Sequence, residues 1–159
     1  MRLSVDYRKY RWSGVIAIAI CLLLIGCSKT DTIESKIVLK ISQCSEPCFV
    51  SIKEIATFKW DKLYVFNLPA SPEEINDALG INYPYYVEFT RPMIFLNGDS
   101  LVYYENNSSN VEGVVDDQVI FGRGSDATKY KIITPENSIF KSDRKISGNK
   151  MNYYELIPI

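Results

Sequence analysis

The chain has 159 residues, enough for one domain, and its apolar and charged fractions, 47% and 23%, are those of ordinary globular proteins. Eleven tyrosines, seven phenylalanines and two tryptophans favour strands. The net charge is −1, but residues 1–26 hold four basic side chains and one acidic side chain, which leaves a net charge of −4 on the rest. Residues 27–159 are therefore mildly acidic and lack the net positive charge that is typical of nucleic-acid-binding proteins.

The N-terminal segment has the three parts of a signal peptide. Basic residues in MRLSVDYRKYRW come first, and residues 14–26 then form a run of 13 residues without a charge. This run is too short for a membrane-spanning helix, which takes about 20 residues, but it has the length of the apolar core of a signal peptide. The pattern therefore predicts an exported protein.

The apolar core ends in Leu-Ile-Gly-Cys at residues 24–27, which resembles the lipobox of bacterial lipoproteins. The resemblance implies that the thiol of Cys27 receives a diacylglycerol, that residues 1–26 are removed, and that the new amino group is acylated, for example with palmitate. Because each buried CH₂ contributes about 0.8 kcal/mol, two or three acyl chains anchor a protein stably. The alternatives are a secretory signal peptide with an incidental cysteine and an uncleaved anchor.

The same resemblance implies a location and divides the mature chain. Ser28 stands where aspartate favours retention in the inner membrane, which implies the outer membrane, with the domain facing the periplasm. Residues 27–35 are then a short lipidated tether, and residues 36–159 form a single domain.

Two cysteines, Cys44 and Cys48, lie in the body of the chain. Export places them where disulfides form and persist. Residues four apart meet the Cα separation of a disulfide in a turn but not in an extended strand, and Pro47 favours the turn. We therefore predict a disulfide that closes a small loop, with free thiols and a redox pair as the alternatives.

The body predicts an α+β domain of mostly antiparallel sheet with one clear helix. The helix is expected at 71–80, where Ser71 is a cap, Pro72 suits the first helical position and Gly80 favours a left-handed stop. A shorter helical turn is expected at 52–56, after a capping box of Ser51 and Glu54. Strands are expected at 35–42, 58–67, 114–121, 129–134, 138–146 and 152–159, with a hairpin at 93–105, a loop at 106–110 and turns at 122–126 and 147–150.

The turn of the predicted hairpin holds Asn-Gly at residues 97–98. A two-residue loop pairs Leu96 with a polar residue, whereas a four-residue loop pairs it with Leu101. The longer loop also pairs Phe95 with Val102. We prefer the longer loop because apolar partners then meet across the strands.

Aromatic side chains alternate along the strand at 58–67, and apolar residues also occupy its other face. This pattern predicts a central strand that is covered on both sides. The aromatic face is either core beneath a helix or a loop, or a surface that binds a sugar, a lipid or a protein partner. Its residues are Phe58, Trp60, Tyr64 and Phe66.

The sequence contains no histidine, which excludes Ser-His and Cys-His nucleophilic pairs and His-ligated zinc sites. The carboxylate pair at 116–117 is interpreted as solvated surface, because neighbouring residues on a strand point to opposite faces. The pair at 73–74 is explained by the helix start. The Gly-Arg-Gly-Ser stretch at 122–125 lacks the spacing of a phosphate-binding loop. We therefore predict no catalytic residue, no metal site and no cofactor.

The strand FKWDKLYVF, the helix SPEEINDALG and the hairpin IFLNGDSLVYYE together resemble small bacterial envelope lipoproteins of unassigned function. This resemblance covers residues 58–105 and implies no site residue. We expect a non-enzymatic, lipid-anchored envelope protein that binds another protein at the periplasmic face, an immunity lipoprotein being one specific form. The alternatives are a protein that binds cell-wall sugars or another small ligand, a carboxylate-dependent hydrolase, and a structural spacer.

Overall fold

The structure of the protein is a computed structural model that describes residues 31–110, 112–122 and 129–159. The predicted signal peptide, the predicted lipid attachment site Cys27 and all but the first residue of the predicted turn at 122–126 lie outside the described residues. Residues Thr32–Ile159 form one compact unit with helices and two sheets, which confirms the predicted α+β class.

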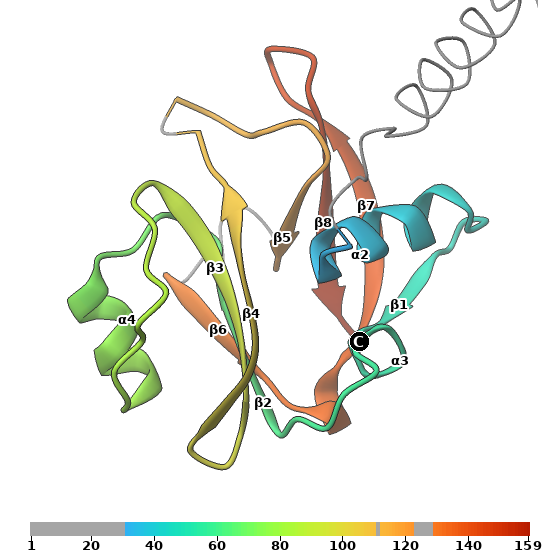
Figure 1. Ribbon diagram of the computed structural model, residues 1–159. Helices are drawn as coiled ribbons and strands as arrows, with labels where there is room; N and C mark the ends of the chain where they lie inside the picture. Colours follow the sequence, from blue (N-terminus) through green and yellow to red (C-terminus); the bar gives the residue numbers. More distant parts are fainter. Residues whose placement is uncertain (1–30, 111, 123–128) are drawn as a thin grey trace, which may run out of the picture. The chain divides into compact units, whose positions relative to one another are not determined.

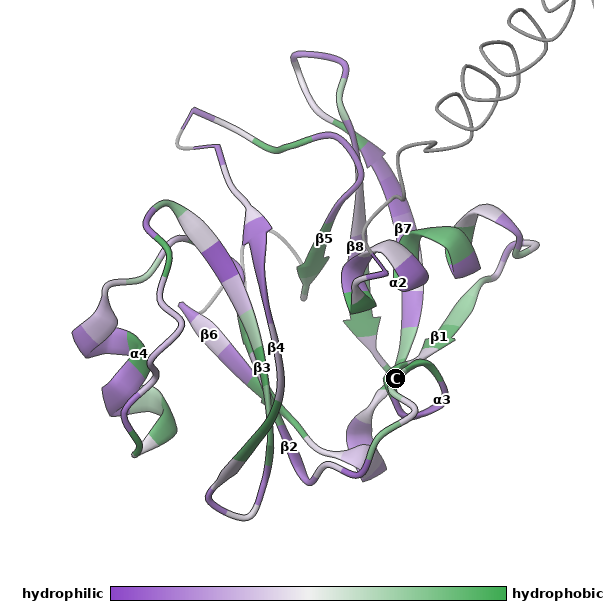
Figure 2. Cartoon of the chain, in the orientation of Figure 1, coloured by the Kyte–Doolittle hydropathy of each residue, from purple (hydrophilic) through white to green (hydrophobic). Residues whose placement is uncertain are grey.

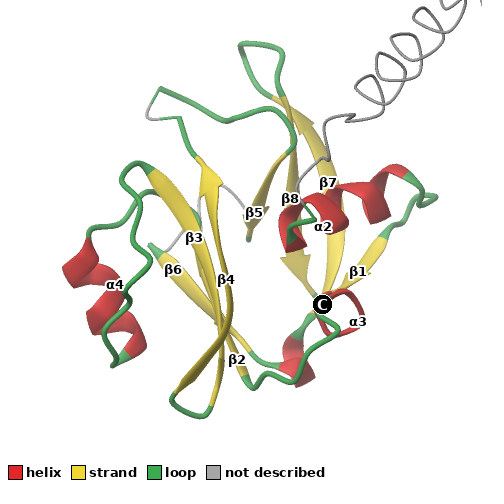
Figure 3. Cartoon of the chain, in the orientation of Figure 1, coloured by secondary structure: helices red, strands yellow, loops and turns green. Residues whose placement is uncertain are grey.

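Two four-stranded sheets form the framework of this unit (Figures 1 and 3). Sheet 1 has the strand order β1-β7-β8-β5, and sheet 2 has the order β4-β3-β2-β6. Neighbouring strands are antiparallel, except that β5 and β8 are parallel. The strands of sheet 1 are β1 (Phe49–Ser51), β5 (Gln118–Phe121), β7 (Ile139–Ile146) and β8 (Asn152–Pro158), and those of sheet 2 are β2 (Lys62–Phe66), β3 (Thr90–Asn97), β4 (Ser100–Ser108) and β6 (Tyr130–Ile133).

Most predicted strands are confirmed, some of them in a shorter form. The segments predicted at 129–134, 138–146 and 152–159 form β6, β7 and β8, and the turn predicted at 147–150 joins the last two. Of the segment predicted at 114–121, only the second half is extended, as β5. Figure 2 shows β5 as largely hydrophobic, which fits a strand whose side chains are mostly buried.

Helix α4 (Pro72–Leu79) confirms the clearest local prediction. Ser71 accepts a hydrogen bond from the backbone N–H of Glu74 and Glu74 bonds back, so that a complete capping box begins the helix. Gly80 ends it with φ of 69°, a conformation that glycine adopts without strain. Figure 2 shows hydrophobic and hydrophilic residues side by side on α4, and its buried residues pack on sheet 2. The short helix predicted after Ser51 is confirmed as α3 (Ile52–Ile55).

The strand predicted at 35–42 is wrong, because this segment belongs to helix α2 (Ile33–Ser42). Thr32 caps the helix by accepting a hydrogen bond from the backbone N–H of Ser35, at 3.1 Å. Its buried residues are Ile33, Ile37 and Val38, and the neighbours Ile37 and Val38 can share one face of a helix but would point to opposite faces of a strand. The domain therefore begins at Thr32, and residues 32–35 are part of the fold rather than of the predicted tether.

Strand β2 separates two hydrophobic cores, which confirms that it is covered on both faces. Leu63 and Val65 belong to core 1, which is shared with α2 and the strands of sheet 1. Tyr64 and Phe66 belong to core 2, which lies under α4. A short 3-10 helix, η2 (Pro135–Asn137), leads from β6 toward β7.

The hairpin of β3 and β4 confirms one of the preferred pairs and corrects the other. Leu96 pairs with Leu101 as predicted, but the strands are joined by a shorter loop, because Asn97 pairs with Ser100. Phe95 pairs with Tyr103 instead of Val102, since the register shifts at a bulge next to Leu96. The segment predicted as a loop from 106 continues β4 as far as Ser108.

Strand β5 lies at the edge of sheet 1, where side chains take the place of a neighbouring strand. The side-chain amide of Asn67, just after β2, donates to the backbone carbonyl of Phe121 at 3.1 Å. Its oxygen accepts from the backbone N–H of Phe121 at 3.0 Å. Asn67 is buried and thus joins the end of β2 in sheet 2 to the edge of sheet 1.

We predict that Asn67→Leu lowers the free energy of unfolding by about 2 to 4 kcal/mol, because it leaves a buried N–H and a buried C=O of Phe121 without partners. Urea denaturation of the Thr32–Ile159 domain, followed by the fluorescence of Trp60, measures this change. Asn82→Leu at an exposed position is the matched control and is expected to change stability by less than about 0.5 kcal/mol. Equal stabilities of the two variants would contradict the assigned role of Asn67.

The predicted disulfide is confirmed, because Cys44 and Cys48 are bonded in the loop between α2 and β1. Their Cα atoms are 5.6 Å apart, within the range that a disulfide requires. Cys48 is buried in core 1, so the bond ties the loop to the hydrophobic interior.

Removal of this disulfide by Cys44→Ser with Cys48→Ser is expected to lower the free energy of unfolding by about 2 kcal/mol, the entropy of closing a loop of this size. A reductant is expected to destabilise the wild-type domain by the same amount. The double variant serves as the control, since a reductant should leave its denaturation midpoint unchanged.

Candidate functional site

The structure places the four residues of the predicted aromatic face in the interior and divides them between two cores. Trp60, Tyr64 and Phe66 are only 6%, 6% and 1% exposed, and Phe58 is half-buried. Phe58 and Trp60 pack in or against core 1, whereas Tyr64 and Phe66 belong to core 2. The alternative in which these four side chains form one binding face is therefore wrong. Strand β2 begins only at Lys62, so the alternation of its side chains does not extend back to residue 58.

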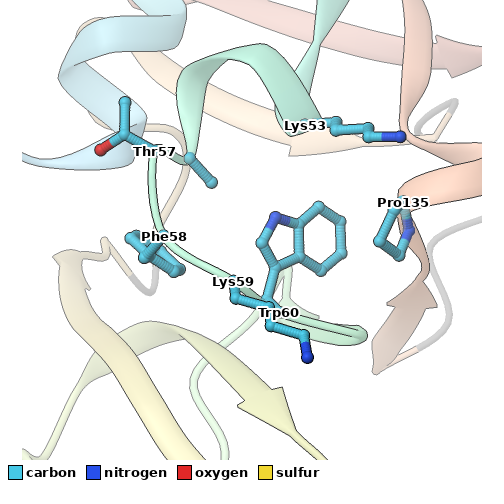
Figure 4. Close-up of a pocket in the computed structure, with 7 residues that line it drawn as sticks. Lys53, Thr57, Phe58, Lys59, Trp60 and Pro135 are labelled. Carbon is cyan, nitrogen blue, oxygen red and sulfur yellow. The ribbon is translucent and has the colours of Figure 1, made fainter.

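An open recess of about 380 Å³ remains beside Phe58 and Trp60 (Figure 4). In Figure 4 the indole of Trp60 stands between Phe58 and Pro135. The ammonium groups of Lys53 and Lys59 lie on different sides of this ring and do not converge on one point. The recess therefore offers an aromatic edge but no pair of cations that could hold an anion between them.

Charged side chains are buried where α2 meets sheet 2. The carboxylate of Glu105 on β4 accepts hydrogen bonds from the backbone N–H groups of Ile33 at 2.7 Å and of Glu34 at 3.0 Å. It also accepts from the hydroxyl of Tyr103 and the side-chain amide of Asn107, both at 2.9 Å. Both carboxylate oxygens are thus engaged, and a negative charge faces the positive end of the α2 dipole.

Arg91 on β3 connects this cluster to strand β5. Its guanidinium donates to the backbone carbonyl of Ser108 at 2.9 Å and to that of Val119 on β5 at 3.2 Å. It also pairs with the carboxylate of Glu34 at 3.1 Å. The same oxygen of Glu34 accepts from the backbone N–H of Val119 at 2.9 Å. We call Glu34, Arg91 and Glu105 the polar seam, because they connect α2 and the two sheets.

Burial raises the pKa of the Glu34 carboxyl above its ordinary value of 4.5. The positive charge of Arg91 and the hydrogen bonds from Val119 and Arg91 oppose this shift, and the nearby charge of Glu105 adds to it. The hydrogen bonds of the seam go to neighbouring backbone and side chains, so its geometry matches a structural joint.

Three of the carboxylates that the sequence analysis interpreted as surface or helix-start residues have structural partners, namely Asp116, Asp117 and Glu74. Asp116 accepts a hydrogen bond from the backbone N–H of Asn152 at 2.9 Å, and Asp117 accepts from the hydroxyl of Tyr154 at 3.4 Å. Glu74 completes the capping box of α4 and pairs with Lys129. Together these contacts tie loops to strands and to a helix.

Three tyrosines form a surface cluster that the sequence analysis did not identify. The rings of Tyr85 and Tyr104 are stacked, with centroids 4.2 Å apart and planes inclined by 7°. Tyr83 meets both rings edge-on, at 6.1 Å and 5.9 Å. Tyr85 and Tyr104 are exposed, whereas Tyr83 is buried. We call these three residues the tyrosine surface.

Hydrogen bonds fix the tyrosine surface to strand β4. The hydroxyl of Tyr83 bonds to the side-chain oxygen of Asn106 at 3.2 Å, and the amide of Asn106 donates to the backbone carbonyl of Tyr85 at 2.9 Å. Burial raises the pKa of Tyr83 to about 12, against the effect of its bond to Asn106, so that its phenol keeps its proton. The two hydrogen bonds of Asn106 hold the loop after α4 against strand β4.

Exposed apolar residues continue from the tyrosine surface along the same segments. Val87 and Phe89 follow in the loop, and Val102 precedes Tyr104 by two residues on β4. Phe89 is 69% exposed and has φ of 58°, a left-handed conformation that is uncommon for a bulky residue. Backbone strain of this kind gathers at functional sites.

The segment that carries the tyrosine surface, residues 80–110, contains no exposed cation. Residues 80–110 hold four charged side chains, of which Arg91 and Glu105 are buried in the polar seam and Glu88 and Asp99 are exposed. The neighbouring polar residues are asparagine, serine and threonine. The signal in the sequence is the lysine-free stretch INYPYYVEFT at 81–90 together with Tyr-Tyr at 103–104.

Comparison of the chain with family models, with curated proteins and with solved structures finds no match. In the ranges 31–110, 112–122 and 129–159, no three histidine, cysteine or acidic side chains are grouped as ligands of a metal ion. No helix within the described part of the chain is long and apolar enough to span a membrane.

The raised pKa of Glu34 predicts a specific pH dependence of stability. Above pH 4.5 and up to this raised pKa, the folded domain holds the proton more tightly than the unfolded chain does, so the contribution of Glu34 to stability falls as the pH rises. Glu34→Gln keeps the acceptor oxygen but cannot titrate. We therefore expect the stability of the wild type, relative to this variant, to decrease with rising pH through that window. Urea denaturation at a series of pH values measures it, and a relative stability that rises with pH would contradict the prediction.

Proposed function

We propose that the protein is a lipid-anchored protein of the bacterial cell envelope and that its domain binds another protein without catalysing a reaction. Ser28, at the position where aspartate favours the inner membrane, supports the outer membrane as its location, with the domain facing the periplasm. The anchor rests on the sequence signal that ends at Cys27. The binding function rests on the tyrosine surface, the one observation that carries it.

The tyrosine surface has the composition of a protein-binding surface. Tyrosine buries a large area when a partner binds and loses little conformational freedom, and it is enriched at the centres of interfaces. Asparagine and serine beside it supply adaptable hydrogen bonds, whereas lysine is depleted at such sites. The stack of Tyr85 on Tyr104 is already formed, so little order has to be created on binding.

The exposed charges of the segment that carries the tyrosine surface favour a partner with a basic rim. Glu88 and Asp99 are the exposed charged residues of the 80–110 segment, and both are acidic. An arginine of a partner would pair with these carboxylates and stack on an exposed tyrosine ring. An immunity lipoprotein that blocks a basic toxin is one form of this function.

The recess beside Trp60 favours a second candidate, the binding of a small ligand with a flat apolar part (Figure 4). This support is weaker than the support of the tyrosine surface for protein binding, because the ammonium groups of Lys53 and Lys59 do not converge on one point of the recess. A carboxylate-dependent hydrolase needs two carboxylates that face each other across the substrate. The recess of Figure 4 has none in its lining, and a second recess beside the disulfide has Glu46 alone.

We expect Tyr85→Ala combined with Tyr104→Ala to weaken partner binding by about 30-fold or more, because central tyrosines contribute at the level of interface hot spots. The measurement is a pull-down from detergent-solubilised envelopes with the full chain as bait, followed by titration of the protein recovered in stoichiometric amount. Phe49→Ala, at an exposed aromatic residue of sheet 1, is the matched control and should bind like the wild type.

Equal capture by the double variant and by the wild type would refute the tyrosine surface as the binding site. The mass of the bait tests the anchor separately. Acyl chains are expected on the wild type and not on Cys27→Ala, and a wild-type bait without acyl mass would refute the lipid anchor.

A further inference from the structure

We propose that the exposed face of α2 docks on the membrane surface, against anionic phospholipid headgroups, and that it thereby sets the orientation of the domain. This inference rests on the proposed lipid anchor at Cys27. It adds a second contact with the membrane, made by the folded domain itself.

The length of the chain before α2 keeps this helix close to the bilayer. Five residues lead from Cys27 to Thr32, the first residue of the compact unit, and they span at most about 18 Å when fully extended. A domain of this size has a radius of gyration of about 14 Å. The N-terminal end of α2 therefore stays within about one domain radius of the acylated residue.

The exposed face of α2 has the chemistry that such a membrane surface favours. At 100° per residue, the exposed positions and two of the half-buried ones, Ser35 and Lys36, form one continuous stripe, opposite the residues that enter or pack against core 1. The stripe carries two lysines and no acidic residue, since the carboxylate of Glu34 points inward to Arg91. It consists of Ser35, Lys36, Leu39, Lys40, Ser42 and Gln43.

Leu39 and the two lysines form an interfacial pattern. Leu39 is 56% exposed although it is a large apolar residue, and Lys36 and Lys40 are one helical turn apart beside it. Lysines near an anionic surface gain attraction to the headgroups while their aliphatic stems cover apolar area. An exposed leucine beside them fits the boundary between headgroups and acyl chains.

Docking through α2 leaves the tyrosine surface free. Tyr104 and Glu105 are neighbours on β4 and therefore point to opposite faces of sheet 2. Glu105 contacts the first turn of α2, whereas Tyr104 stacks on Tyr85 on the other face. The surface proposed to bind a partner thus faces away from the helix proposed to bind the membrane.

The test measures how close α2 lies to the lipid. The full chain is expressed with its signal so that it is acylated, with a single added thiol at Leu39→Cys or, as a matched control, at Phe89→Cys. Each thiol is labelled with a bimane fluorophore, and the proteins are reconstituted in phosphatidylcholine vesicles with or without phosphatidylglycerol. A nitroxide-labelled lipid then quenches any fluorophore that lies at the bilayer surface.

We expect strong quenching of the label at position 39, little at position 89, and stronger quenching at 39 when phosphatidylglycerol is present. Lys36→Gln with Lys40→Gln is expected to lower the equilibrium constant for docking about 30-fold, since each lysine contributes about fivefold. Equal quenching at both positions, or no effect of the double lysine variant, would overturn the docking inference while the anchor stands. Loss of acyl mass and of vesicle association would instead overturn the anchor, and the docking inference with it.

Discussion

The two sheets depend on how the free edge of β5 is closed. One side of this strand pairs with β8, and on its other side the peptide groups of Val119 and Phe121 have no neighbouring strand. A buried peptide group without a partner costs about 1 to 3 kcal/mol, so the fold has to supply partners from elsewhere. Asn67 bonds both groups of Phe121, and Glu34 and Arg91 bond those of Val119. Because these side chains come from α2 and from sheet 2, closing one strand edge also fixes the helix and both sheets.

This constraint explains why ionisable groups lie deep in a protein for which we propose no catalysis. Arg91 is buried and the side chain of Glu34 is largely so, because the backbone of β5 needs a donor and an acceptor there. Glu105 is buried because the first N–H groups of α2 need an acceptor. A buried ion pair is weak evidence for stability by itself, but each charge here also bonds to a backbone group. The cluster therefore specifies one arrangement of helix and sheets among many that would bury similar apolar area.

The sequence predicts those parts of the fold whose causes are local. The helix α4 follows from Ser71, Pro72 and Gly80 because its cap, first turn and stop all lie within its own ten residues. The sequence predicts a strand in place of α2, because the cap and the first buried residue of this helix lie in the segment that the sequence assigns to the tether, and its other residues fit either period. The polar seam could not be predicted, since it joins residues up to 85 positions apart in the sequence. The tyrosine surface is an intermediate case, because its loop is visible in the sequence but the stacking partner on β4 is not.

Strand β4 connects the two surfaces to which we assign functions. Its residues alternate between a face that holds α2, through Glu105, and a face that carries Tyr104. A helix docked on the bilayer and a partner bound to the tyrosine surface would therefore act on opposite faces of one rigid sheet. A short tether then suits the function, because the orientation of the domain comes from the fold and not from the length of the linker. In this arrangement the buried carboxylate of Glu105 fixes α2 on β4, the strand that also carries Tyr104. It would thereby set the angle between the membrane and the bound partner.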